Sequence, residues 1–240
     1  MLVEFSFENF RSYKEKQTFS LLASKDKSLL LENTFNVEKN INLLKTATFY
    51  GANASGKSSF FMALSSFLEF AVLSGPQGQQ GEPIKIAPFM LDIDKQTAPT
   101  SFEIIFFTST QASYTRYRYG IKIDRTHIIE EYLCALNNVR EVFLFTRENQ
   151  KISYNKKFFP EAETFSTKTV RENASYLSVC AQNNGNISGA IINYFRKIII
   201  TSGINPPPIF TLNQIEKGDN LPEIVNFLHF ADIQLVNEEN

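Results

Sequence analysis

The sequence contains no tryptophan, only two cysteines and almost no net charge. Two cysteines in 240 residues cannot form the disulfide framework of a small secreted domain, so we expect Cys134 and Cys180 to be reduced thiols of a cytoplasmic protein. The 24 lysine and arginine residues are balanced by 25 aspartate and glutamate residues. The chain as a whole therefore has no basic field that would attract nucleic acid, and contact with DNA or RNA would need a local patch.

Long apolar runs are also missing. No stretch reaches the roughly 18 apolar residues of a membrane span, so we expect no membrane contact. The N-terminal segment carries Glu4 and Glu8 and lacks the basic start of a signal peptide. What is present, 43% hydrophobic and 20% charged residues, is the composition of a folded globular protein with one large or two modest domains.

Alternating polar and apolar residues predict strands in much of the chain. Residues 2–10 alternate, a second strand is expected over 16–23, and a third over 42–50 runs directly into Gly51. From about residue 100 to 154, segments rich in β-branched and aromatic residues are separated by short polar breaks. This pattern predicts an antiparallel β meander.

Helices are predicted in two regions. Residues 59–73 contain neither glycine nor proline and are apolar nearly all round, which is typical of a buried helix packed on a sheet; an exposed loop is expected at 74–83. After Lys168 the apolar residues recur with a helical period, and a last helix is expected to begin near Asp219. We therefore predict an α/β protein with a β-rich lobe at residues 1–168 and a helical subdomain at 169–240.

Residues 51–58 read Gly-Ala-Asn-Ala-Ser-Gly-Lys-Ser and fit the phosphate-binding pattern G-x-x-x-x-G-K-[ST]. The glycines let the backbone turn its N–H groups towards a phosphate, and the start of the following helix adds partial positive charge. Lys57 would meet the β- and γ-phosphates, and the Ser58 hydroxyl would ligate Mg²⁺. A strand before and a helix after distinguish this phosphate-binding loop (P-loop) from a chance glycine turn. The predicted nucleotide-binding residues are Gly51, Ala52, Asn53, Ala54, Ser55, Gly56, Lys57, Ser58 and Ser59.

The chain resembles the first lobe of ABC- and SMC-type ATPase heads. A strand-rich stretch precedes the P-loop and a meander follows it, whereas a small nucleotide kinase usually begins with the P-loop strand. Residues 8–13, Glu-Asn-Phe-Arg-Ser-Tyr, are similar to the N-F-[RK]-S-[YFH] segment that follows the first strand in SMC, RecF and related repair ATPases. The resemblance implies that this segment lies beside bound ATP and that Arg11, with Ser12 next to it, approaches the phosphates or the base. The alternative for Arg11 is a solvated arginine at a strand end.

The resemblance narrows to bacterial ATP-binding proteins of the RloA and OLD-like AAA ATPase group. It is carried by MLVEFSFENFRSYKEKQTFSLLAS, FYGANASGKSSFFMAL, APFMLD, SFEIIFF, YRYGI and NASYLS. These segments span nearly the whole chain, although only the P-loop and the Asn-Phe-Arg-Ser segment are specific. The group is often found in phage-defence loci. The resemblance implies ATP and Mg²⁺ as cofactors, a head-to-head homodimer in the full-length protein, and a nuclease or toxin as partner.

Two motifs of such heads are not evident. Residues 73–77, Leu-Ser-Gly-Pro-Gln, imitate the LSGGQ signature but follow Lys57 too closely, and Ile187–Gly189 is an equally weak match. Residues 89–92 and 128–131 are the candidates for a Walker B strand, yet both precede any plausible signature. We therefore expect the chain to be the N-terminal part of a longer ATPase, in which hydrolysis depends on C-terminal motifs.

Several weaker features remain open at this level. His127 and His229 are interpreted as structural, and Gln77, Gln79 and Gln80 either touch Mg²⁺ or belong to a low-complexity loop. Basic and aromatic residues alternate along one predicted strand, with Tyr114, Arg116 and Arg118 on one face and Tyr117 and Tyr119 on the other. Such a strand could bind single-stranded nucleic acid by stacking and phosphate contacts. The interpretation that we favour is a solvated face opposite a core face. Besides an ATPase lobe, the sequence is compatible with a non-hydrolysing nucleotide sensor that gates a partner. A phosphotransferase is disfavoured by the β-rich start.

Overall fold

The computed structural model describes residues 1–25, 30–38, 41–110, 113–136, 140–164 and 169–201, together with Pro222, Asn226 and Phe230. The chain divides into two compact units, Met1–Ile198 and Ile199–Asn240, and the first contains all the elements below. The domain boundary predicted at residue 168 and the body of the helix predicted from Asp219 lie outside the described residues. Both stay predictions.

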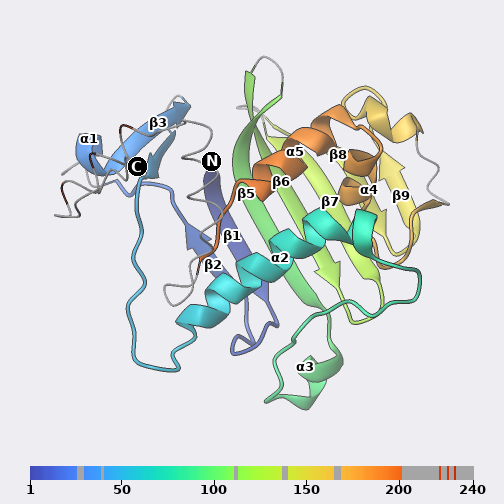
Figure 1. Ribbon diagram of the computed structural model, residues 1–240, viewed down its shortest axis with the longest axis horizontal. Coiled ribbons are helices and arrows are strands. Elements are labelled where there is room, and N and C mark those ends of the chain that lie inside the picture. The colour runs from blue at the N-terminus through green and yellow to red at the C-terminus, as the bar shows by residue number, and fades with distance from the viewer. Residues whose placement is uncertain are drawn as a thin grey trace, which may run out of the picture. The chain divides into compact units, whose positions relative to one another are not determined.

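A seven-stranded antiparallel sheet forms the centre of the first unit, in the order β2-β1-β5-β6-β7-β8-β9 (Figure 1). The strands are β1 (Leu2–Glu8), β2 (Gln17–Ser20), β5 (Thr100–Thr110), β6 (Ser113–Ile123), β7 (Ile128–Leu136), β8 (Glu141–Glu148) and β9 (Lys151–Tyr154). Strands β5 to β9 follow one another in both sequence and space, so the predicted meander and the α/β class are confirmed.

One face of this sheet is covered by α2 (Lys57–Gln77), α4 (Tyr176–Gln182) and α5 (Asn186–Arg196) (Figure 1). The core between the layers is built from phenylalanine. Phe67 of α2 packs against Phe5 at 5.7 Å and Phe195 at 5.8 Å between ring centroids, and all three rings are buried. Since 23 phenylalanines and no tryptophan fill the chain, rings of one size meet across the sheet–helix interface.

Smaller elements flank this layer pair. A short helix α1 (Leu30–Asn33) leads into a two-stranded sheet of β3 (Thr34–Glu38) and β4 (Ile41–Leu44). Leu43 of β4 is buried against Val3 and Phe107, which ties this sheet to the main one. The remaining elements are α3 (Ile93–Thr97) and the 3₁₀ turn η1 (Pro160–Thr164). Within the described parts of the chain, no helix is both long and apolar enough to cross a membrane.

The predicted strand over 42–50 is correct only at its start. β4 ends at Leu44, and residues 46–50 are irregular. A strand needs a partner along its edge, and β4 pairs with β3 and, through a bridge between Leu22 and Leu43, with residues 21–23. Beyond Leu44 no described strand runs alongside the chain, so the β-prone sequence before the P-loop stays unpaired.

The predicted loop at 74–83 begins too early. α2 continues through Pro76 to Gln77, and Ser74 and Gly75 are buried. The Arg171 guanidinium donates to the carbonyls of Ser74 at 2.8 Å and Gly75 at 2.9 Å, so it satisfies two of the free carbonyls of the last turn. This stabilisation comes from a residue almost 100 positions away, which local glycine and proline content cannot reveal.

Candidate nucleotide-binding site

The P-loop leaves β4 through the unpaired segment and ends where α2 begins. Ala54 and Gly56 have left-handed backbones, with φ of 64° and 96°, and the Ser55 N–H donates to the Ala52 carbonyl at 3.3 Å. The loop therefore curls on itself and surrounds a hollow of about 260 Å³, lined by Ser12 and residues 53–59. A concave turn of this kind at a helix start is an anion-binding geometry.

Lys57 supplies the charge of this hollow. Its ammonium donates to the carbonyl oxygens of Gly51 and Ala52, both at 2.7 Å, and lies 3.4 Å from Ser55 Oγ. The first turn of α2 has no side-chain cap and no acidic residue, so no carboxylate of this turn pairs with its free N–H groups. The ammonium and these N–H groups together can receive a phosphate group.

Ser58 is the residue that would hold Mg²⁺. It is exposed, lines the hollow and follows Lys57 on the first turn of α2. Among the described residues no cluster of three or more histidine, cysteine, aspartate or glutamate side chains could bind a metal by itself. The donor set therefore suits a magnesium ion held by one hydroxyl and by phosphate oxygens, where it would neutralise phosphate charge.

The N-terminal segment meets the P-loop through two of its residues. Ser12 lines the hollow, and the Tyr13 hydroxyl donates to the Gly56 carbonyl at 3.2 Å. The side chain of Arg11 is exposed and is not part of the lining, while its backbone N–H donates to Ala87 at 2.8 Å. The geometry thus brings Ser12 to the site and leaves Arg11 outside the hollow. The role of Arg11 towards phosphates stays a prediction, and Tyr13 is a contact that the sequence analysis missed.

The Walker B candidate at residues 128–131 has a structural role in this chain. Glu131 is buried and accepts hydrogen bonds from Tyr119 Oη at 3.0 Å, Ser175 Oγ at 3.1 Å and Tyr176 N at 2.8 Å, with Arg147 Nη1 at 3.6 Å. Burial raises the pKa of Tyr119 well above its usual value and lowers that of Arg147. The carboxylate thus joins β6, β7, β8 and the start of α4.

This network lies far from the P-loop. Ser175 N donates to Ser74 Oγ at 3.0 Å, near the C-terminal end of α2, whereas the P-loop precedes its first residue. With 21 residues and 1.5 Å of rise each, α2 separates its two ends by about 30 Å. The same distance places Gln77, at the end of α2, and the following Gln79 and Gln80 away from the hollow.

The other weak motifs also occupy structural positions. Asp92 caps α3 by accepting from Asp94 N at 3.0 Å and pairs with Lys14 at 2.7 Å, so residues 89–92 form no buried Walker B strand. Ile187 lies in the first turn of α5, where its N–H donates to a Glu161 carboxylate oxygen at 2.7 Å. Neither signature look-alike opens a helix towards the P-loop hollow.

Two further expectations can be placed in the structure. His127 lies in the β6–β7 turn, 3.2 Å from Asp124, as a structural histidine would, and His229 lies outside the described residues. Tyr117 and Tyr119 are buried, whereas Arg118 of the same strand pairs with Glu141 with an Nε–Oε1 distance of 2.8 Å. This is the arrangement of a core face opposite a solvated face, as the alternation favoured.

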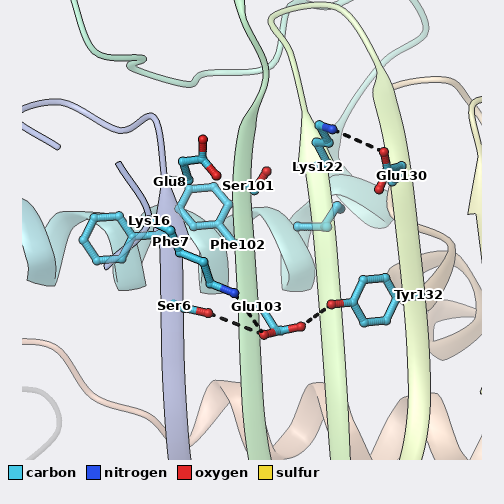
Figure 2. Close-up of a pocket in the computed structure, with 11 residues that line it drawn as sticks. Ser6, Phe7, Glu8, Lys16, Ser101, Phe102, Glu103, Lys122, Glu130 and Tyr132 are labelled. Atoms are coloured by element: carbon cyan, nitrogen blue, oxygen red, sulfur yellow. Dashed lines mark hydrogen bonds and ion pairs between the residues drawn. The ribbon is translucent and has the colours of Figure 1, made fainter. Parts of the chain in front are cut away.

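A second hollow, of about 230 Å³, lies on the sheet face opposite α2 and α5 (Figure 2). At its centre Glu103 accepts a hydrogen bond from Tyr132, faces Ser6 Oγ at 3.5 Å and pairs with Lys16 at 3.7 Å. Gly120 of β6 is the register partner of both Glu103 in β5 and Tyr132 in β7, and the tyrosine side chain crosses over it to reach Glu103. A Cβ on Gly120 would lie 2.3 Å from the tyrosine ring. These polar groups satisfy one another, so the hollow presents no orphaned group to a ligand.

The sheet, the helix layer and the P-loop together define a P-loop protein of the ATPase type. Residues 47–194 match the family model described as "AAA domain, putative AbiEii toxin, Type IV TA system". The match covers more than half of the chain, and the chain belongs to this family. Nucleotide binding of the ATPase type is the function that membership supports. No curated protein matches the sequence.

Proposed function

We propose that the chain is the nucleotide-binding part of an SMC/ABC-like ATPase that binds Mg-ATP at the P-loop. In this proposal hydrolysis depends on residues outside the chain, from C-terminal motifs and from a second head in a head-to-head homodimer. The setting is a bacterial phage-defence or DNA-maintenance system of the RloA and OLD-like kind, in the cytoplasm. The two cysteines of the described core are buried free thiols, which suits a reducing compartment.

The observation that carries the proposal is the geometry at the start of α2. An ammonium, uncapped helix N–H groups and an exposed hydroxyl converge on one hollow beside Ser12. Phosphoryl transfer relies mainly on positioning and charge neutralisation, and these groups offer both to a β- or γ-phosphate. The hollow contains no carboxylate that would repel the nucleotide.

Two observations support the dependence on further residues. The carboxylates of the two Walker B candidates, which could have activated water, have structural contacts instead: Glu131 is buried beside Arg147, and Asp92 caps α3. The backbone of residues 46–50, just before the P-loop, makes no hydrogen bond with the described parts of the chain, and Tyr50 is 89% exposed. A β-prone segment in this state can pair with strands of a larger assembly.

The test is calorimetric titration of the full chain with Mg-ATP, followed by an assay of phosphate release. We expect binding without appreciable turnover. Lys57→Ala should weaken binding by about ten- to a hundredfold, since it removes charge-assisted hydrogen bonds. Lys156→Ala serves as the matched control, because Lys156 is exposed and pairs with Glu163 away from the hollow.

Two results would contradict the proposal. If the wild type and Lys57→Ala bound Mg-ATP with equal affinity, the P-loop would not be the nucleotide-binding site. Turnover of about one per second by the isolated chain would show that no outside residue is needed.

A second candidate is a non-hydrolysing nucleotide sensor that gates a partner nuclease or toxin. The family description favours it, because it names a toxin of a toxin–antitoxin system. A sensor responds to occupancy alone, so a non-hydrolysable ATP analogue should alter the partner's activity as fully as ATP does. An ATPase-driven system should respond to ATP and not to the analogue.

A further inference from the structure

A fixed turn links the first strand of the sheet to the P-loop. Phe10 and Tyr13 exchange two backbone hydrogen bonds, both at 2.9 Å, which close the turn. The preceding Asn9 is buried, and its amide donates to the carbonyls of Lys95 and Ala98, both at 2.9 Å. The turn is therefore held from inside the protein, and Tyr13 projects from a rigid base.

Tyr13 contacts the junction between the P-loop and α2. Its ring packs edge-on against the buried Phe7 at 5.1 Å, and its hydroxyl donates to the Gly56 carbonyl at 3.2 Å. The same carbonyl accepts the first helical hydrogen bond, from Phe60 N at 3.1 Å. A Cβ on Gly56 would lie 2.8 Å from the tyrosine oxygen, so the two residues fit against each other without spare room.

We propose that Tyr13 is a positioning residue of the nucleotide site, an inference that rests on the proposed function. By holding the Gly56 carbonyl, it fixes where α2 begins and hence where the N–H groups of the first turn point. It also keeps Ser12, its neighbour in the turn, against the hollow. Groups that are fixed before the ligand arrives lose less entropy on binding. The contact between Tyr13 and Gly56 should therefore increase the affinity for the nucleotide.

The test compares two tyrosine-to-phenylalanine variants of the full chain. Tyr13→Phe keeps the ring against Phe7 and removes the hydroxyl. Tyr154→Phe makes the same change in β9, the edge strand at the other end of the sheet from β2. One neutral hydrogen bond corresponds to about two- to tenfold in affinity. We expect the dissociation constant for Mg-ATP to rise by this factor in Tyr13→Phe and to stay unchanged in Tyr154→Phe.

A second readout does not need nucleotide. Hydrogen exchange of the Phe60 amide, which bonds to the Gly56 carbonyl, should be faster in Tyr13→Phe than in the wild type without ligand. If the wild type binds no ATP, the proposed function fails. The exchange rate then still shows whether Tyr13 holds the loop.

A lower melting temperature of Tyr13→Phe with an unchanged dissociation constant would overturn the inference, because a purely structural residue behaves in this way. An unchanged Phe60 exchange rate would also overturn it. A weaker affinity with a melting temperature close to that of the wild type supports it.

Discussion

Gly56 is the residue on which the local conformation of the site depends most directly. Its φ of 96° and ψ of −2° are left-handed, and a Cβ would approach Tyr13 Oη to 2.8 Å and Ser12 Oγ to 3.2 Å. Replacement by alanine imposes about 1–2 kcal/mol of backbone strain and also pushes the loop away from the N-terminal turn. We expect Gly56→Ala to weaken Mg-ATP binding about tenfold or more, measured by calorimetric titration.

Gly81 provides the matched control for this substitution. It also has a left-handed backbone, with φ of 80°, but no atom lies within 4 Å of the position that its Cβ would take. Gly81→Ala should lower the free energy of unfolding by the same backbone strain of about 1–2 kcal/mol, and it should bind Mg-ATP as tightly as the wild type. If both variants bind ATP like the wild type, the loop conformation at Gly56 does not matter for the nucleotide.

The sequence predicted most of the residues that line the hollow, and their roles towards a nucleotide stay predictions. Residues 53–59 follow from the P-loop pattern because the chemistry of phosphate binding fixes their spacing, and the structure gathers them around one hollow. Tyr13 was missed because its contact with Gly56 joins positions 43 residues apart and no local pattern contains it. The serine and tyrosine of the Asn-Phe-Arg-Ser-Tyr segment, and not the arginine, are the residues that reach the loop.

At the scale of elements, the packing of α2 on α4 depends on a glycine in the segment that imitates a signature motif. A Cβ on Gly75 would lie 2.7 Å from Ser178 Oγ and 3.0 Å from the Ser178 backbone carbon. Overpacking costs about 1–3 kcal/mol, which exceeds the gain of about 1 kcal/mol from alanine in a helix. We expect Gly75→Ala to lower the free energy of unfolding by up to about 2 kcal/mol, measured by denaturant titration.

Gly189 in α5 is the control for this prediction. A Cβ added there would meet no atom within 4 Å and the helix around it is regular, so Gly189→Ala should raise the free energy of unfolding by up to about 1 kcal/mol. Effects of opposite sign would show that the contact with Ser178, and not helix propensity, determines the requirement at Gly75. Equal effects would contradict the packing argument.

The elements themselves were largely predictable where the pattern is local. The alternation in β1 and the aromatic runs of the meander gave correct strands, because a half-buried strand displays its period in the sequence. The errors arose where a distant partner decides the outcome. Arg171 extends α2 by satisfying its last carbonyls, and the absence of a described neighbouring strand leaves residues 46–50 irregular. The burial of Glu131 depends on five surrounding donors from three segments, which no motif search could assemble.

At the scale of the molecule, the two hollows differ in what they offer a ligand. The hollow in Figure 2 contains carboxylates and lysines that already pair with one another, as Lys122 does with Glu130 at 3.3 Å. The P-loop hollow has an ammonium bonded only to loop carbonyls and a hydroxyl and, in the described chain, no acidic lining residue. A phosphate can displace the carbonyl contacts of Lys57, whereas it would have to break ion pairs at the other hollow. Of these two hollows, an anionic ligand should therefore choose the one at the P-loop.

This preference predicts how ligand binding changes the stability of the whole fold. A ligand at a hundred times its dissociation constant stabilises the native state by about 2.7 kcal/mol, and each kcal/mol raises the melting temperature of a domain of this size by about 2–4 °C. Mg-ATP should therefore raise the melting temperature of the wild type by about 5–10 °C in a calorimetric scan. The shift should shrink when EDTA removes Mg²⁺, because the phosphates would keep Lys57 but lose the ion that Ser58 helps to hold. The shift should fall to about half or less at the same ligand concentration in Lys57→Ala, because a ten- to hundredfold higher dissociation constant leaves only part of the stabilisation. It should be retained in Lys122→Ala, and the reverse pattern would place the nucleotide on the opposite face of the sheet.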